Sequence, residues 1–289
     1  MEIKTIAVIG AGTMGNGIAQ LAAMTGLEVW LQKRKREVDD WLGRALKPID
    51  ASLERVVKSG KMQESEKKAT LERIHPTHDL EQAVKNADYV IESIPEVLDL
   101  KQKMFGDLDK LAPGHAILST NTSQFPITSF GKATKRPDKV IGTHFFNPPV
   151  MRRFVEIVRG LDTSDQTLQI TRDLLKSWEM ETIVCQRDSA GFITTRLLAL
   201  FVNEAQRIHE EGLATAEDID KACRLAFGHP MGPMETSDFT GLDTGLKVRE
   251  ALFHAYGERY RPTQSLKILV EAGHWGRKTG RGYYKYEKK

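Results

Sequence analysis

The sequence predicts an α/β protein: a domain with a mainly parallel sheet, followed by an all-α domain. Short β-rich runs alternate with amphipathic stretches as far as Cys185, and only long helical patterns follow. Strands that alternate with helices build parallel sheets covered on both faces. Because the pattern changes near Arg187, we expect one domain over residues 1–186 and a second over residues 187–289.

Each element is expected from its local pattern. The β-rich runs predict strands at Thr5–Ile9, Leu27–Leu31, Tyr89–Ile91, Ala116–Ser119, Val140–Thr143, Phe154–Val158 and Thr182–Cys185. Amphipathic periodicity predicts helices at Val38–Lys58, Leu98–Leu111 and Gln166–Trp178. In the second domain, Phe192–Glu211 predicts one long helix, and Thr215 begins the pattern TAED, which resembles a capping box and opens another. Tyr283–Tyr286 is the one candidate strand there.

Composition limits the class of protein. A chain of 289 residues that is 40% hydrophobic can form one large or two ordinary domains, and a net charge of +3 is too small to indicate nucleic-acid binding. Cys185 and Cys223 lie far apart, which argues against a zinc site or a disulfide framework and fits a reducing compartment. No apolar stretch approaches the length of a membrane span, which is about 20 residues. We expect no signal peptide and a cytoplasmic protein.

A glycine-rich turn, GAGTMG, directly follows the first predicted strand. In the order strand, G-x-G-x-x-G, helix, Gly10 makes the tight turn, Gly12 lets a pyrophosphate approach the backbone, and Gly15 lets the helix pack on the strand. Thr13 and Met14 complete the turn, and the helix N-terminus behind it favours phosphate. A glycine turn without a ligand is the alternative, but the context favours a Rossmann-type domain that binds a nicotinamide dinucleotide.

The end of the second predicted strand departs from the NAD pattern. Such a strand usually ends in an acidic residue about 20 residues beyond the glycines, and this residue binds the ribose hydroxyls. The sequence instead has QKRKR, with Lys33 and Arg34 where an acid is expected. These cations would attract a 2′-phosphate, so the pattern favours NADP(H) and does not exclude NAD(H). A solvated basic surface at a helix start is the alternative explanation.

One histidine and one carboxylate lie within apolar runs of GTHFFNPPVMRRFVEIV, residues 142–158. His144 ends one predicted strand and Glu156 lies in the next, so a strand–turn–strand arrangement would bring them together. An imidazole suits the proton transfer that accompanies hydride transfer at a secondary alcohol. A carboxylate on its second nitrogen would fix the tautomer. Taken alone, however, a histidine beside two phenylalanines is more often a packed core residue.

Motifs in both predicted domains follow one another along essentially the whole chain. They are GAGTMGNGIA, NTSQFPIT, GTHFFNPPVM, FVEIV, GFITTRLL, GHPMGPMETSDFTGLD and KTGRGYY. Together they resemble the 3-hydroxyacyl-CoA dehydrogenase family, above all its short, single-function 3-hydroxybutyryl-CoA dehydrogenases. The resemblance implies reversible hydride transfer between C3 of an acyl-CoA, such as 3-hydroxybutyryl-CoA or acetoacetyl-CoA, and a nicotinamide cofactor.

The resemblance also implies roles for single residues. His144 matches the catalytic histidine, Glu156 the carboxylate that orients it, and Ser123 the serine that contacts the substrate's 3-oxygen and the cofactor. Ser52 and Lys58 fall where the family's helix meets coenzyme A. The positions that line the family's cofactor site are matched by Glu96, Lys101, Asn121, Asn147 and Lys278.

Two positions depart from the family pattern. Lys33 stands where the family usually has an aspartate, and Thr195 stands where it usually has an active-site asparagine. Threonine keeps a hydroxyl donor but loses the second hydrogen bond of an amide, so the contacts around the substrate are expected to differ. Ser123 also fits as the cap of a short helix within NTSQFPIT.

Other functions stay open at this point. One is a related dehydrogenase of a free hydroxy acid or sugar acid, which would lack a CoA-binding helix; SLERVVKSGK favours coenzyme A, although a solvated helix face explains it nearly as well. Another is a non-catalytic dinucleotide-binding protein, against which Ser123, His144 and Glu156 together argue. The apolar segments LLALFVNEAQRI and MGPMETSDFTGLDTGLKV are expected to form the interface of a homodimer.

Overall fold

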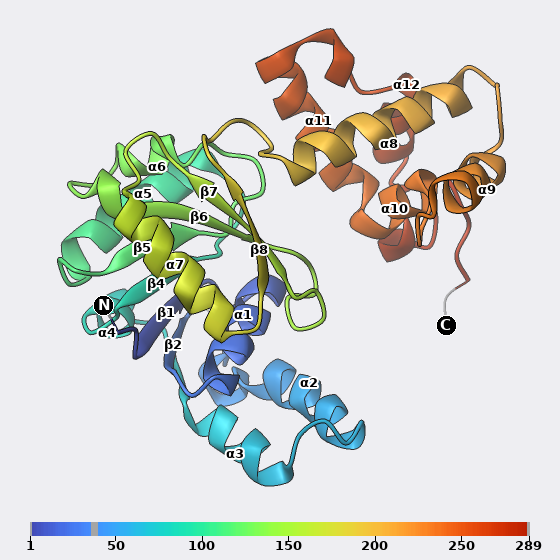
Figure 1. Cartoon of the computed structure of the whole chain (residues 1–289). Helices are drawn as coiled ribbons and strands as arrows, with labels where there is room; N and C mark the ends of the chain where they lie inside the picture. Colours follow the sequence, from blue (N-terminus) through green and yellow to red (C-terminus); the bar gives the residue numbers. More distant parts are fainter. Residues whose placement is uncertain (1, 36–39, 288–289) are drawn as a thin grey trace. The chain divides into compact units, whose positions relative to one another are not determined.

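The chain folds into two compact units, Met1–Asp188 and Ser189–Lys289. The structure, a computed structural model, describes residues 2–35 and 40–287. Figure 1 colours the first unit from blue to yellow and the second from yellow to red.

The first unit is built around an eight-stranded sheet with the order β3-β2-β1-β4-β5-β6-β7-β8. Its strands are β1 (Thr5–Ile9), β2 (Glu28–Gln32), β3 (Ile74–Thr77), β4 (Tyr89–Glu92), β5 (Ile117–Thr120), β6 (Val140–Phe145), β7 (Phe154–Arg159) and β8 (Glu181–Cys185). The strands from β3 to β6 pair in parallel, whereas β7 is antiparallel to β6 and parallel to β8. The expected mainly parallel α/β sheet is therefore confirmed.

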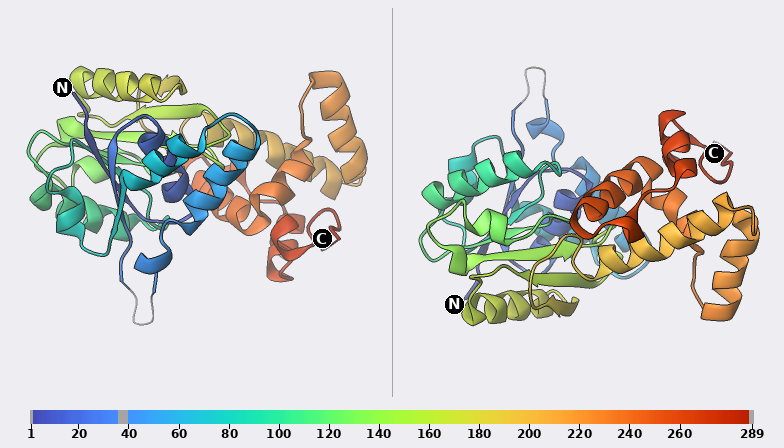
Figure 2. Two further views of the ribbon diagram at one scale, coloured as in Figure 1. Left: turned by 90° about the horizontal axis from the view of Figure 1, so that it is seen from below. Right: turned by 90° about the horizontal axis from the view of Figure 1, so that it is seen from above.

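Helices cover both faces of this sheet. They are α1 (Thr13–Met24), η1 (Leu42–Arg44), α2 (Lys47–Lys58), α3 (Glu64–Glu72), α4 (Leu80–Val84), α5 (Leu98–Leu111), α6 (Thr128–Gly131), η2 (Pro137–Lys139) and α7 (Asp165–Ser177). Figure 2 shows the yellow-green α7 on one face and the teal α5 on the other. Because both faces are covered, β1 is apolar and fully buried from Ile6 to Ile9.

One local prediction for this unit is wrong, and one strand was not expected. A single helix over Val38–Lys58 does not form, because η1 precedes a separate α2 that begins at Lys47; Val38 itself lies outside the described residues. Pro48 explains the break, since proline has no N–H for a helical ladder and is tolerated only in a first turn. The edge strand β3 was not expected, because its sequence, IHPT, carries a proline that only an edge strand accepts.

The second unit is helical, as predicted. It contains α8 (Thr194–Glu210), α9 (Ala216–Phe227), α10 (Pro233–Thr240), α11 (Leu242–Tyr256), η3 (Glu258–Tyr260), α12 (Gln264–Glu271) and η4 (Arg277–Thr279). Thr215 caps α9, as expected, by accepting the N–H of Asp218 at 3.2 Å. The candidate strand Tyr283–Tyr286 is wrong, because among the described residues the tail makes only isolated bridges. The Asp238 carboxylate accepts the tail's N–H groups that a strand partner would need.

Two further features bear on the environment of the protein. None of the helices in the described ranges combines the length and the apolar character of a membrane span. Cys185 and Cys223 are both buried free thiols.

Candidate active site

The glycine turn between β1 and α1 has the geometry that a dinucleotide needs. Gly10 has a φ of +109°, and a Cβ on it would lie 2.5 Å from the carbonyl oxygen of Ser93. A Cβ on Gly15 would lie 1.7 Å from the carbonyl oxygen of Gly10, so only glycine lets α1 approach β1 this closely. A Cβ on Gly12 would have no atom within 4 Å. The backbone at Gly12 thus faces open space at a helix N-terminus, which fits a pyrophosphate.

The basic residues follow β2 at the same edge of the sheet. The first glycine of the turn donates its N–H to the carbonyl oxygen of Gln32 at 2.8 Å. Lys33 comes next and is half-buried, and its Nζ lies 5.5 Å from the centroid of the Trp41 ring. Arg34 is exposed, and the last residue of the basic run, Arg36, lies outside the described residues. Lys33 and Arg34 thus occupy the strand end where an adenosine ribose is expected.

His144 and Glu156 face each other across the antiparallel pair β6–β7. They are direct register partners, and Nδ1 of the imidazole lies 3.1 Å from Oε2 of the carboxylate. The Glu156 side chain is fully buried, and that of His144 is 9% exposed. The Phe146 ring lies 4.5 Å from the imidazole, centroid to centroid. A buried carboxylate at Nδ1 orients the ring and stabilises its protonated form, which is the arrangement of an acid–base histidine.

The loop after β5 carries Ser123. Its N–H donates to Oε1 of Glu96 at 3.1 Å, and the Thr122 hydroxyl bonds to the same oxygen. Oδ1 of Asn121 accepts the N–H of Phe145 at 2.8 Å. The loop is therefore tied both to Glu96 and to the strand end that carries the histidine.

Ser123 does not cap a helix, so that alternative is wrong. The next helix, α6, begins at Thr128 with Ile127 at its N-cap. The hydroxyl that organises the turn belongs to Thr122, which accepts the N–H groups of Gln124 at 3.4 Å and Phe125 at 3.2 Å.

Lys101, on α5, is buried beneath this loop. Its side chain is 1% exposed, and Nζ lies 2.8 Å from Oε1 of Glu92 and 3.2 Å from Oε2 of Glu96. Glu92 was not predicted from the sequence. The available signal was a carboxylate that ends the apolar strand YVIE at the edge where the other site residues lie.

The loop after His144 contacts the helix of the glycine turn. Asn147 is exposed and precedes Pro148 through a cis peptide bond. A Cβ on Gly17 of α1 would lie 3.0 Å from Cδ of Pro149. The structure thus brings the Asn147 loop beside α1.

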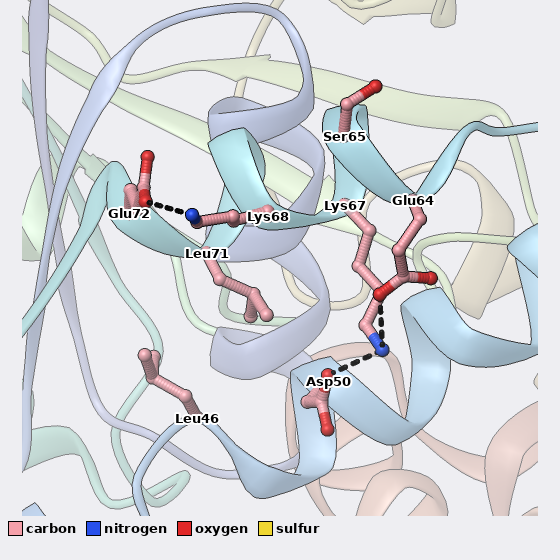
Figure 3. Close-up of a pocket in the computed structure, with 8 residues that line it drawn as sticks. All are labelled: Leu46, Asp50, Glu64, Ser65, Lys67, Lys68, Leu71 and Glu72. Carbon is pink, nitrogen blue, oxygen red and sulfur yellow. Dashed lines mark ion pairs between the residues drawn. The ribbon is translucent and has the colours of Figure 1, made fainter.

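Ser52 and Lys58, the candidates for coenzyme A, both lie on α2. Ser52 is half-buried, and Lys58 is exposed and pairs with Glu54 at 3.4 Å. A hollow of about 550 Å³ lies between α2 and α3, but neither residue lines it. Figure 3 shows that Lys67 in this hollow is directed at Asp50, 3.0 Å away. The hollow is therefore lined by ion pairs, and the predicted role of Ser52 and Lys58 remains a prediction.

Thr195 and Lys278 belong to the second unit. Thr195 lies half-buried in the first turn of α8. Lys278 lies in η4, where its ammonium pairs with the Asp243 carboxylate and lies 5.1 Å from the centroid of the Trp275 ring. Their predicted roles in the reaction remain predictions.

A doubly covered parallel sheet with this glycine turn and a buried histidine–carboxylate pair defines a nicotinamide-dependent dehydrogenase. Family profiles agree: one described as "3-hydroxyacyl-CoA dehydrogenase, NAD binding domain" matches residues 5–189, and one described as "3-hydroxyacyl-CoA dehydrogenase, C-terminal domain" matches residues 191–286. The chain belongs to the 3-hydroxyacyl-CoA dehydrogenase family and is an oxidoreductase.

Individual relatives give the same result. The chain is 42% identical over 290 residues to a probable 3-hydroxybutyryl-CoA dehydrogenase of Bacillus subtilis, covering 100% of this chain and 99% of that protein. It is 39% identical over 284 residues to the 3-hydroxybutyryl-CoA dehydrogenase of Clostridioides difficile, covering 98% and 99%. The crystal structure of (S)-3-hydroxybutyryl-CoA dehydrogenase from Ralstonia eutropha matches with a TM-score of 0.94 and 39% identity, covering 99% and 100%. The resemblance inferred from the motifs is confirmed.

Proposed function

We propose that this protein interconverts 3-hydroxybutyryl-CoA and acetoacetyl-CoA. The observation that carries the proposal is the buried pair of His144 and Glu156, 3.1 Å apart, at the sheet edge that holds the glycine turn. The names of the relatives described above give 3-hydroxybutyryl-CoA as their substrate. A free hydroxy acid is the weaker candidate, because the relatives described above are named for 3-hydroxybutyryl-CoA.

Oxidation of the substrate removes the hydroxyl proton and a hydride from C3. A nicotinamide cofactor held at the glycine turn would supply the hydride acceptor for oxidation and the hydride donor for reduction. Nε2 of His144 takes the proton while Nδ1 keeps its contact with Glu156, whose charge stabilises the imidazolium. In reduction the imidazolium protonates the forming alkoxide. The Ser123 hydroxyl orients the 3-oxygen, and Thr195 donates a second hydrogen bond to the substrate.

The proposal also assigns side chains and backbone groups to the cofactor. In this proposal the glycine turn, including Thr13 and Met14, binds the pyrophosphate through backbone N–H groups. The turn's open backbone at Gly12 supports this role. The side chains that would contact the nicotinamide half or its ribose are Glu96, Lys101, Asn121, Asn147 and Lys278, and Ser52 and Lys58 would meet coenzyme A.

One assay tests the function. Purified protein is mixed with acetoacetyl-CoA and NADPH or NADH, and the nicotinamide absorbance is followed; free acetoacetate is the matched control. Turnover of the thioester but not of the free acid supports the proposal. Turnover of the free acid alone points to the other class of dehydrogenase, and no turnover of either contradicts the proposal.

The preferred cofactor in this proposal is NADP(H). The support is the position of Lys33 and Arg34 at the end of β2, where an NAD-binding domain usually has an acidic residue. Each charge-assisted hydrogen bond to a 2′-phosphate contributes roughly 1.5–3 kcal/mol, so one contact gives about a tenfold preference for NADPH.

Lys33→Asp tests this preference. The change removes an attraction and adds a repulsion against the 2′-phosphate, so kcat/KM should shift toward NADH by about tenfold or more. The measurement is the ratio of kcat/KM for the two cofactors in wild type and variant, with Lys35→Asp as the control on the same basic run. A wild type that prefers NADH, with a ratio that Lys33→Asp leaves unchanged, would show that the run is a solvated surface.

The active form in this proposal is a homodimer joined through the second unit. Its support is the large exposed apolar surface on α8 and α9, where Leu197 is 65%, Leu225 77% and Phe227 67% exposed. Leu225→Glu should weaken the dimer, which light scattering after size exclusion measures; an unchanged mass excludes α9 from the interface. The two free thiols fit the cytoplasmic location that we also propose.

A further inference from the structure

A buried network of charges begins at Glu92, at the end of β4. Its side chain is fully buried, and both of its oxygens are occupied. Oε1 accepts a hydrogen bond from the N–H of Ile94 at 2.7 Å and another from Nζ of Lys101 at 2.8 Å. Oε2 accepts the hydroxyl of Thr120 at 2.7 Å and lies 3.1 Å from the same Nζ. A buried carboxylate with this many donors is held in one position.

Lys101 connects Glu92 to a second carboxylate. Besides Glu92, its Nζ lies 3.3 Å from the carbonyl oxygen of Ile94 and 3.2 Å from Oε2 of Glu96. Its side chain is 1% exposed. The ammonium therefore joins two carboxylates inside the protein.

Glu96 passes the connection to the backbone of the site. Its Oε1 accepts the N–H of Ser123 at 3.1 Å and the hydroxyl of Thr122. The N–H of Thr122 in turn donates to the hydroxyl oxygen of Thr120 at 3.2 Å, and that hydroxyl bonds Glu92. The loop that carries Ser123 is thus attached to the network at two points.

We propose that Glu92 is a positioning residue: by holding Lys101, and through it Glu96, it fixes the backbone of Ser123. The inference rests on the proposed function, in which Ser123 orients the substrate's 3-oxygen. A fully satisfied buried network is rigid, whereas removal of one charge leaves the other members unpaired and free to rearrange. A displacement of about 1 Å at a reacting centre can lower the rate by about 100-fold.

Substitutions at the two ends of the ion pair test the network. Glu92→Gln, which leaves every proposed cofactor contact in place, should lower kcat for acetoacetyl-CoA reduction by about tenfold to 100-fold, while the Kd of the cofactor, measured by its fluorescence, changes less than about threefold. Lys101→Met should lower kcat to a similar extent and, because Lys101 is also a proposed cofactor contact, should raise that Kd as well. The double variant should be no slower than the slower single variant, because both changes break the same connection. Lys103→Met, an exposed lysine on the same helix, is the matched control.

The opposite pattern would overturn the inference. If Glu92 does not act through Lys101 and Glu96, Glu92→Gln should keep a kcat close to that of wild type, or its loss of kcat should add to that of Lys101→Met. Thr122→Val is a third variant, which breaks the far end of the network without an unpaired buried charge. It should lower kcat and Thr122→Ser should restore it; equal rates for the two would contradict the role of the loop.

A measurement without turnover separates this inference from the proposed function. Amide hydrogen exchange at Ser123, in protein without ligands, should be slow in wild type and in Lys103→Met. It should be about tenfold faster or more in Glu92→Gln and Lys101→Met. Unchanged protection in both variants overturns the positioning role, even if their turnover falls. A wild type with a protected Ser123 amide but no acetoacetyl-CoA turnover contradicts the proposed function and leaves the network intact.

Discussion

The two units of the chain accommodate buried charge in opposite ways. In the first, Glu156 faces the imidazole of His144, and Glu92 faces the ammonium of Lys101. In the second, Asp238 forms no ion pair with a cation in the part of the chain that the structure describes. It is 1% exposed and accepts two backbone N–H groups and one tyrosine hydroxyl, those of Tyr283, Tyr284 and Tyr286. Burial raises the pKa of Asp238.

Arg249 makes the contrast sharper. Its side chain is 3% exposed, and Nη1 donates to the carbonyl oxygen of Gly245, one turn earlier on α11, at 2.9 Å. Over the described ranges, Nε has no hydrogen-bond partner and no carboxylate pairs with the guanidinium. Burial lowers the pKa of Arg249 to about 10. The desolvation of this cation is therefore not compensated as it is for Lys101.

The difference indicates what each arrangement is for. A buried carboxylate beside a basic side chain can hold that group in place or stabilise its protonated form, so such pairs belong near the chemistry. A carboxylate that accepts backbone N–H groups instead fixes the path of the chain, as Asp238 does for the C-terminal tail. Changes to the paired site residues of the first unit should therefore affect the rate, whereas changes to Asp238 should affect stability and leave the rate unaltered.

The largest effect is expected at His144. His144→Gln removes the acid–base group and should lower kcat by about 10²–10⁴-fold, with the cofactor's Kd and the Tm nearly unchanged. Glu156→Gln should be impaired as well, because the imidazolium loses its charged partner. The measurements are steady-state kinetics and a thermal melt. Turnover of wild-type size in folded His144→Gln would contradict the mechanism.

Asp238 tests the other half of the comparison. Asp238→Asn keeps the shape but places an NH2 group against backbone N–H donors, so the free energy of unfolding should fall by about 2–3 kcal/mol. Chemical denaturation gives this value, and kcat per folded molecule is the control. A normal denaturation midpoint would show that the tail is held by its apolar contacts; a large loss of kcat at full stability would mean that this unit also sets the rate.

Thr195 is a smaller and sharper test, because it is the one predicted catalytic residue in the second unit. Thr195→Val keeps the shape and loses the hydroxyl, so kcat should fall by about tenfold if the hydroxyl bonds the substrate, as one hydrogen bond would give. Thr195→Asn should retain substantial activity, since it restores the family's usual side chain. A Thr195→Val enzyme with the kcat of wild type would show that Thr195 contributes only to packing.

Local signals were enough to predict the parts of the site that are built locally. The glycine turn follows a strand directly, and His144 and Glu156 lie on consecutive antiparallel strands, so spacing alone brought them together. The family motifs then located Ser123 on its loop.

The buried networks were not predictable in this way. Glu92 meets Thr120 across 28 residues only because β4 and β5 are neighbours in the sheet, and no periodicity encodes that order. Asp238 meets the tail across 45 and 46 residues for a similar reason, which is also why the tail was mistaken for a strand. The start of α2 was misplaced because an amphipathic pattern continued past Pro48, where backbone hydrogen bonding could not.

The smallest expected effect concerns Arg249, and the sign of the change in the free energy of unfolding is the informative result. Arg249→Met keeps an unbranched stem and removes a buried cation that lacks a carboxylate, so it should raise the free energy of unfolding by about 1 kcal/mol. Lys101→Met makes the equivalent change in the first unit, where it leaves two carboxylates without their cation. It should therefore lower the free energy of unfolding by about 3 kcal/mol or more. Urea denaturation of both variants against wild type is the measurement, with each midpoint read at two protein concentrations so that association of the chains does not enter. Opposite signs would establish that a paired carboxylate, and not burial itself, decides whether a buried cation stabilises or destabilises this fold. A destabilised Arg249→Met would mean that the guanidinium is neutralised by a group outside its own chain, and the comparison between the two units would fail.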